Sequence, residues 1–108
     1  MRFRIRSSQR DSNSDASRIA AVEQSIRGAI AGAEAEKKGL GQRLSRYRTE
    51  ASLAMGNSTY GNEDRDPEDE KLLSGIEAQM SEALARMKAL DAHIEHLNGV
   101  LSLLLKAR

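Results

Sequence analysis

The sequence predicts an all-α protein, a long antiparallel hairpin of two coiled-coil-like helices that dimerises into a four-helix bundle. Apolar residues recur at alternating steps of three and four through two long stretches of the chain, which is the spacing of helices that pack side by side. One short segment of turn-forming residues separates the two stretches, and the period of two that a strand requires is absent from both.

The second stretch, residues 67–106, has a strong helix start. Asp66 can accept a hydrogen bond from a free N–H of the first turn, and Pro67 suits the first helical position. Acidic residues 68–70 lie in the positive field of the helix N-terminus, and Lys106 has the favourable sign at the other end. Ten apolar residues then follow the heptad without a gap: Leu73, Ile76, Met80, Ala83, Met87, Leu90, Ile94, Leu97, Leu101 and Leu104.

The first stretch, residues 15–55, has the same period less cleanly, and Ser14 or Asp15 can cap its start. Glu23 and Lys37 interrupt one of its two apolar rows. Four glycines each weaken a helix by about 1 kcal/mol relative to Ala. One row is Ile19, Ile26, Ala33, Leu40, Tyr47 and Ala54. The other row is Ala16, Glu23, Ile30, Lys37, Leu44 and Ala51. The glycines are Gly28, Gly32, Gly39 and Gly41.

Residues 56–66 contain turn formers without periodicity and form the predicted loop. A short link between two helices of about 40 residues, each roughly 60 Å long, forces them to pack antiparallel. Folding about this loop places Arg43 and Arg46 near Glu77 and Glu82, so that opposite charges meet. It places Lys37 near Glu82, with its stem on the seam and its amine in solvent.

Apolar residues outside the seam predict self-association into the four-helix bundle, because a two-helix hairpin needs apolar groups only along its seam. The alternative is that the N-terminal segment folds back and Phe3 and Ile5 cover Leu103 and Leu105. A stripe of small residues on the first helix is a second candidate contact, and its alternative is a solvated helix with tolerated glycines. The candidate interaction residues are Gly28, Gly32, Ala35, Gly39, Leu72, Leu84, Val100 and Leu105.

Charge is segregated although the net charge is only +1. Residues 1–13 form a predicted basic, flexible arm that carries Arg2, Arg4, Arg6 and Arg10, and residues 63–70 hold an acidic run. The alternation of charged and apolar residues over 2–6 is strand-like. Three interpretations of the arm stay open: a disordered tail, a strand added to a partner or to its twin, and a segment that tracks the phosphates of nucleic acid or an acidic membrane.

Several function classes are disfavoured by composition and motifs. The chain has no Cys, which excludes disulfides and Cys-ligated metals. His93 and His96 stand three apart rather than at the four-residue spacing of helical metal pairs, so we interpret them as surface residues. No phosphate-binding or nucleophile motif occurs, so we expect no enzymatic activity, cofactor or metal. No apolar segment reaches the roughly 18 to 20 residues of a membrane span, and we expect a cytoplasmic protein.

The function that these features favour is a small protein–protein interaction module, an adaptor, chaperone or regulator, that acts as a homodimer and binds a further, unidentified protein. Two alternatives remain. One is a nucleic-acid-associated regulator that uses the arginine arm, although the near-neutral net charge disfavours bulk nucleic-acid binding. The other is a structural component of a secretion or motility assembly.

Overall fold

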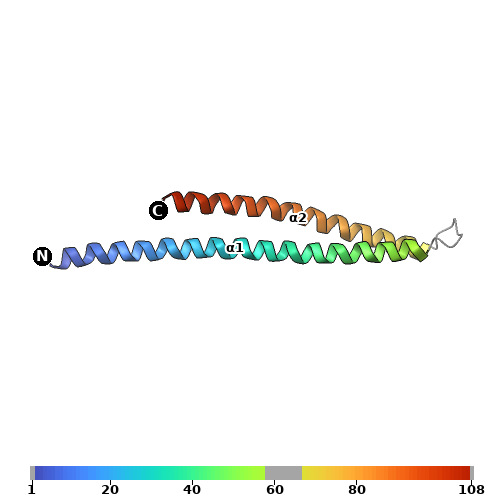
Figure 1. The fold of residues 1–108 in the computed structure, drawn as a ribbon, viewed down its shortest axis with the longest axis horizontal. Coiled ribbons are helices and arrows are strands. Elements are labelled where there is room, and N and C mark those ends of the chain that lie inside the picture. Colours follow the sequence, from blue (N-terminus) through green and yellow to red (C-terminus); the bar gives the residue numbers. More distant parts are fainter. Residues whose placement is uncertain (1, 58–66, 108) are drawn as a thin grey trace.

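A computed structural model shows two long helices, α1 (Arg2–Asn57) and α2 (Pro67–Ala107), that lie antiparallel side by side (Figure 1). The structure describes residues 2–57 and 67–107, with side chains over residues 8–55 and 67–107, and this part of the chain is entirely helical. The hairpin is a thin rod whose Cα atoms extend over 93 × 16 × 15 Å. The all-α hairpin is therefore confirmed, and its assembly into a four-helix bundle stays a prediction.

The seam of α2 confirms the heptad pattern position by position. All ten predicted apolar residues, from Leu73 to Leu104, are buried or half-buried. All the remaining residues from Glu70 to Ala107 are exposed. The stripe is narrow because α2 contacts one neighbouring helix, which covers only the side of α2 that faces it.

The seam of α1 follows its two predicted rows between Glu23 and Ala54, where each row position is buried or half-buried. Ala16 and Ile19, the first members of the rows, are exposed. The reason is the unequal length of the helices, since α1 has 56 residues and α2 has 41. As a result α1 continues past the C-terminal end of α2, where no second helix covers it (Figure 1).

The helix boundaries differ from the prediction mainly at the N-terminus. The loop boundaries agree within two residues, since α1 ends at Asn57 and α2 begins at Pro67. The N-terminal boundary was wrong, because α1 begins at Arg2 rather than near residue 15. Residues 2–13 contain neither Gly nor Pro, so nothing in them interrupts a helix. Asp15 is not a cap but lies within α1, where its Oδ1 accepts a hydrogen bond of 3.1 Å from Arg18 Nη1.

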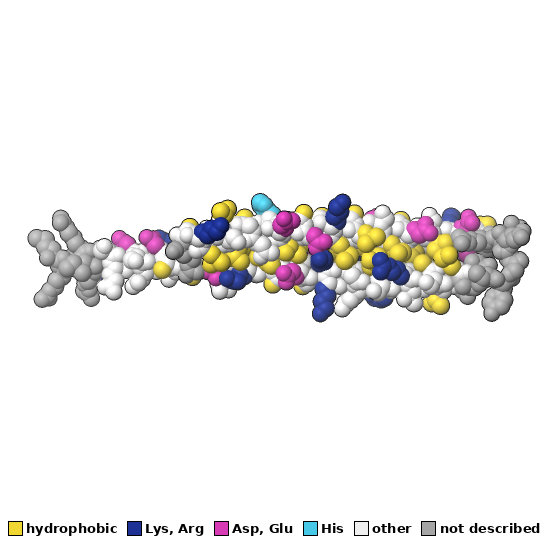
Figure 2. All heavy atoms as spheres, turned by 45° about the horizontal axis from the view of Figure 1, so that its top comes forward, with side chains coloured by type: hydrophobic (Ala, Val, Ile, Leu, Met, Phe, Trp, Pro, Cys, Tyr) yellow, Lys and Arg dark blue, Asp and Glu magenta, His cyan; other side chains and the backbone are white. Residues whose placement is uncertain are grey.

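The centre of the rod is a small apolar cluster in which Leu90 of α2 packs with Ala83, Ala33 and Leu40. Leu90 is only 1% exposed. The hydrophobic side chains of α1 and α2 gather in a band between the two helices, bordered by charged side chains (Figure 2). None of the buried side chains in the described part of the chain is polar, so the hairpin is held together by the burial of these apolar groups.

Leu90→Ala tests this centre. Removing a fully buried leucine side chain should lower the free energy of unfolding by about 2–4 kcal/mol, because the rigid seam cannot collapse fully onto the cavity. Urea unfolding followed by circular dichroism measures the loss. Leu53→Ala is the control, since Leu53 is 65% exposed and its truncation should change the free energy by no more than about 0.5 kcal/mol. Equal losses in the two variants would contradict the assigned core.

Candidate interaction surface

An ion pair across the seam identifies one flank of the hairpin. Arg86 of α2 donates from Nε to Glu36 Oε2 at 2.7 Å and from Nη2 to Glu36 Oε1 at 3.1 Å. This two-bond geometry matches the planar guanidinium to the carboxylate. The hydrogen bond from Arg86, together with the charges of Arg86 and Arg43, holds the pKa of Glu36 below its ordinary value. We call the side of the hairpin that carries this pair the Arg86 flank.

A second ion pair identifies the opposite flank, which we call the Asp91 flank. Lys37 occupies a seam row of α1 and is half-buried, and its Nζ contacts Asp91 Oδ1 of α2. The amine of Lys37 therefore contacts a carboxylate rather than solvent alone, and this partner lies nine residues beyond Glu82, the residue near which the sequence placed Lys37. The other interruption of the row, Glu23, is also half-buried and accepts a 2.9 Å hydrogen bond from Arg27 Nε.

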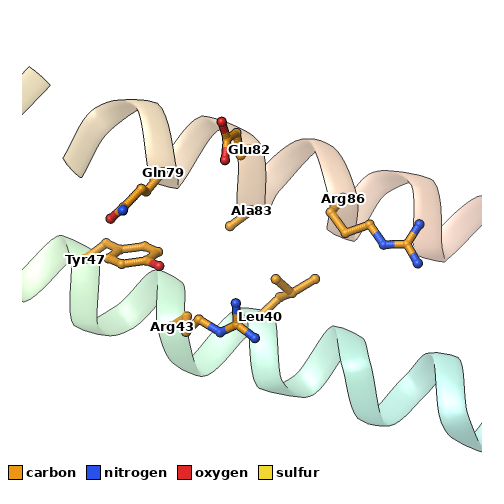
Figure 3. Close-up of a pocket in the computed structure, with 7 residues that line it drawn as sticks. All are labelled: Leu40, Arg43, Tyr47, Gln79, Glu82, Ala83 and Arg86. Carbon is orange, nitrogen blue, oxygen red and sulfur yellow. The ribbon is translucent and has the colours of Figure 1, made fainter. Parts of the chain in front are cut away.

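A polar hollow of about 310 Å³ lies between the helices toward the loop end. Tyr47 reaches from α1 toward Gln79 of α2, and Leu40 and Ala83 lie between the helices (Figure 3). Arg43 and Glu82, predicted to approach each other, line this same hollow. The hollow is open to solvent and its lining combines the seam with charged groups, which suits it to receive a side chain of a bound protein. It is lined by Leu40, Arg43, Tyr47, Gln79, Glu82, Ala83 and Arg86.

The two ion pairs divide the predicted interaction residues between the flanks. Residues seven apart on a packed helix face the same way. Leu72 and Val100 each lie fourteen residues from Arg86 and so belong to the Arg86 flank. Leu84 and Leu105 lie seven and fourteen residues from Asp91 and belong to the Asp91 flank. All four side chains are exposed, so the structure confirms that they lie outside the seam and separates them into two surfaces.

Further exposed apolar residues lie at both ends of the rod and were not among the predicted interaction residues. Leu53 and Met55 are exposed near the loop, and Leu103 near the C-terminus. Leu103 lines a hollow of about 490 Å³ on the outer surface of α2, with Ala92, Glu95, His96, Gly99 and Val100. The signal that could have identified Leu103 is the run from Val100 to Leu105, which is apolar at every residue except Ser102.

The small-residue stripe of α1 is exposed at Gly28, Gly32 and Ala35 and half-buried at Gly39. A Cβ built at Gly28, Gly32 or Gly39 meets no atom within 4 Å, and Ala35 is exposed. The packing of the hairpin therefore does not require glycine at these positions. Gly41 is different, because its Cβ would lie 3.8 Å from Cε of Met87. Met87 packs against the apolar cluster, so it belongs to the core.

The remaining predicted features are surface features or lie outside the described residues. His93, His96 and Arg10 are exposed. The side chains of Arg2, Arg4 and Arg6 and half of the acidic run, residues 63–66, are outside the described part. Within that part, the structure holds no cluster of three or more His, Asp or Glu that could bind a metal ion. Neither helix, over its described length, has a segment apolar enough to cross a membrane.

Comparison with known proteins identifies no relative of this chain. No family model matches the chain, no curated protein matches its sequence, and no solved structure matches its fold. The surfaces of the hairpin must therefore be interpreted from their own residues.

Glu36→Gln tests the ion pair of the Arg86 flank. Because the pKa of Glu36 is lowered in the folded protein, its contribution to stability is present above the ordinary carboxyl pKa and is lost as the pH falls through the lowered value. The wild-type melting temperature should therefore fall between about pH 5 and pH 3 more than that of Glu36→Gln. Thermal unfolding across this range is the measurement. Glu34→Gln, an exposed position on the same helix, is the control. If the melting temperature of Glu36→Gln fell with pH as steeply as that of the wild type, the ion pair would not be the cause of the pH dependence.

Proposed function

We propose that this chain is a helical protein–protein interaction module that acts as a homodimer and presents helix surfaces to a further protein. The observation that carries the proposal is the set of large apolar side chains exposed outside a complete two-helix seam. They are Val22, Leu53, Met55, Leu72, Leu84, Val100, Leu103 and Leu105, joined at the end of the seam by Ile19.

The distribution of these side chains supports association rather than scattered surface exposure. Single exposed apolar residues are ordinary on protein surfaces. Here Val100 and Leu103 lie one turn apart and line the same hollow of α2, and Leu53, Met55 and Leu72 lie near the loop end. The hollow formed by Glu50, Leu53, Ala54, Leu72 and Ile76 connects two of them across the helices. Packing against another helical surface would remove these groups from water and widen the core from two helices to four.

A binding role also fits the hollows better than a catalytic one. Those formed by the described residues are open and lie on the sides of a rod, whereas catalysis favours a concave pocket with convergent polar groups. The ionisable side chains that line the polar hollow are Arg43, Tyr47, Glu82 and Arg86, and they include no Ser, Cys or Lys nucleophile beside a His base. We therefore propose that the module works by contact with helices of other proteins.

Sedimentation equilibrium tests the homodimer. The purified chain should have twice its monomer mass of 11.9 kDa at concentrations of tens of micromolar, and dilution should shift it to the monomer, because the exposed apolar groups gain from burial only when a partner is present. A mass of one chain up to about 100 µM, with circular dichroism showing full helicity, would contradict self-association.

A nucleic-acid-associated regulator is the second candidate, favoured by the part of α1 that continues beyond α2. Arg2, Arg6 and Arg10 are four residues apart in the sequence, which is the spacing of residues that share one face of a helix. This candidate predicts duplex DNA binding that weakens steeply between about 50 and 200 mM salt and is lost on deletion of residues 1–10. Binding unaffected by the deletion, or no binding at the lower salt concentration, would eliminate it.

A further inference from the structure

We infer that the second copy of the chain docks on the Arg86 flank in the half of the rod that holds the C-terminal end of α2. We call this surface the terminal face; its central residues are Val22 and Ala29 of α1 and His93, His96, Val100 and Leu103 of α2. The inference rests on the proposed homodimer and specifies which surface forms it.

The Glu36–Arg86 pair establishes that the two helices contribute to this face together. Val22 lies fourteen residues before Glu36, and Val100 lies fourteen residues after Arg86. Because the helices run antiparallel with a seven-residue repeat, these steps lead along the same flank toward the same end of the rod. Both valines are exposed. Leu103, one turn beyond Val100, extends the apolar surface to the 490 Å³ hollow on the outside of α2.

The charge pattern distinguishes this face from the rest of the surface. The flank rows contribute Val22, Ala29, His93 and Val100 to the centre of this face, and the charged residue of these rows at its outer end, Asp15, forms an ion pair with Arg18. Toward the loop, the same rows carry Glu36, Arg43, Glu50 and Arg86. At the same end of the rod, the Asp91 flank carries Arg27, Glu34 and Asp91. A neutral face can meet a copy of itself without like charges opposing each other and without burying an unpaired ion.

The size of the face fits a second hairpin. From Ala89 to Ala107, α2 runs about 28 Å. Two packed helices are roughly 20 Å wide. The face therefore offers about 500–600 Å² per copy, so two copies bury about 1,000–1,200 Å², which reaches the lower range of specific interfaces. A single foreign helix, about 10 Å wide, would cover only half of it. The N-terminal segment of the same chain does not cover it, because α1 runs straight past the end of α2 (Figure 1).

Three glutamate substitutions test the terminal face by sedimentation equilibrium. Leu103→Glu places a carboxylate on the face. Leu53→Glu is its matched control at the loop end, since these leucines are 69% and 65% exposed. Leu84→Glu, at a position 48% exposed, tests the Asp91 flank. Leu103→Glu should raise the dimer dissociation constant at least about tenfold, because a two-fold interface contains the substitution twice. The two controls should change it less than about twofold.

The outcomes separate the face from the dimer itself. A monomeric wild type would overturn the proposed homodimer together with its face. A dimeric wild type whose dissociation constant is unchanged by Leu103→Glu, or is raised more by Leu84→Glu or Leu53→Glu, would overturn the face and leave the homodimer standing. Circular dichroism monitors folding of each variant. If Leu103→Glu loses helicity, Leu103→Gln replaces it, because Gln is a good helix former without a charge. Leu103→Gln should also raise the dimer dissociation constant.

Discussion

The rest of the structure depends on the interlocking of two apolar rows from α1 with two from α2. Each helix presents one narrow stripe, and each stripe is covered by the other helix alone, so the hairpin has no third layer that could compensate for a lost contact. Leu90 is the most completely buried side chain of the described core. Because the stripe is narrow, charged groups can line both sides of it, and the flanks rather than the seam decide how the rod meets other molecules.

Register is the property that the apolar rows leave undecided. A slip of seven residues would still place apolar groups opposite apolar groups over most of the seam. The same slip would move Lys37 from Asp91 toward Leu84 or Asn98, and Glu36 from Arg86 toward Gln79 or His93. Exposed ion pairs contribute little to stability, but a polar group at a seam position favours one register over its alternatives. Lys37, which interrupts the row, therefore helps to specify the alignment that the leucines tolerate.

The seam of α2 was predictable residue by residue, because a heptad pattern along one helix needs no knowledge of its partner. The start of α2 was predictable because Pro67 and the acidic residues after it favour a helix start locally. The start of α1 was not predictable, because the alternation of charged and apolar residues over 2–6 resembles a strand, yet no residue there opposes a helix. Leu84 could not be separated from Val100, since the flank on which an exposed leucine lies depends on which residues pair across the seam.

The placement of Leu84 and Val100 on opposite flanks changes what the exposed apolar side chains imply. If the exposed apolar residues all lay on one surface, they would form a long stripe with charged residues along its whole length. Divided between flanks, they leave one surface, around Val22 and Val100, that is apolar on both helices and neutral in both flank rows. The stretches nearer the loop carry the Glu36–Arg86 pair and the polar hollow around Tyr47. A charged stretch discriminates between partners because a mismatched charge is costly. A neutral apolar face does not discriminate in this way, and this difference is why we propose a second copy, which has the same neutral face, as its occupant.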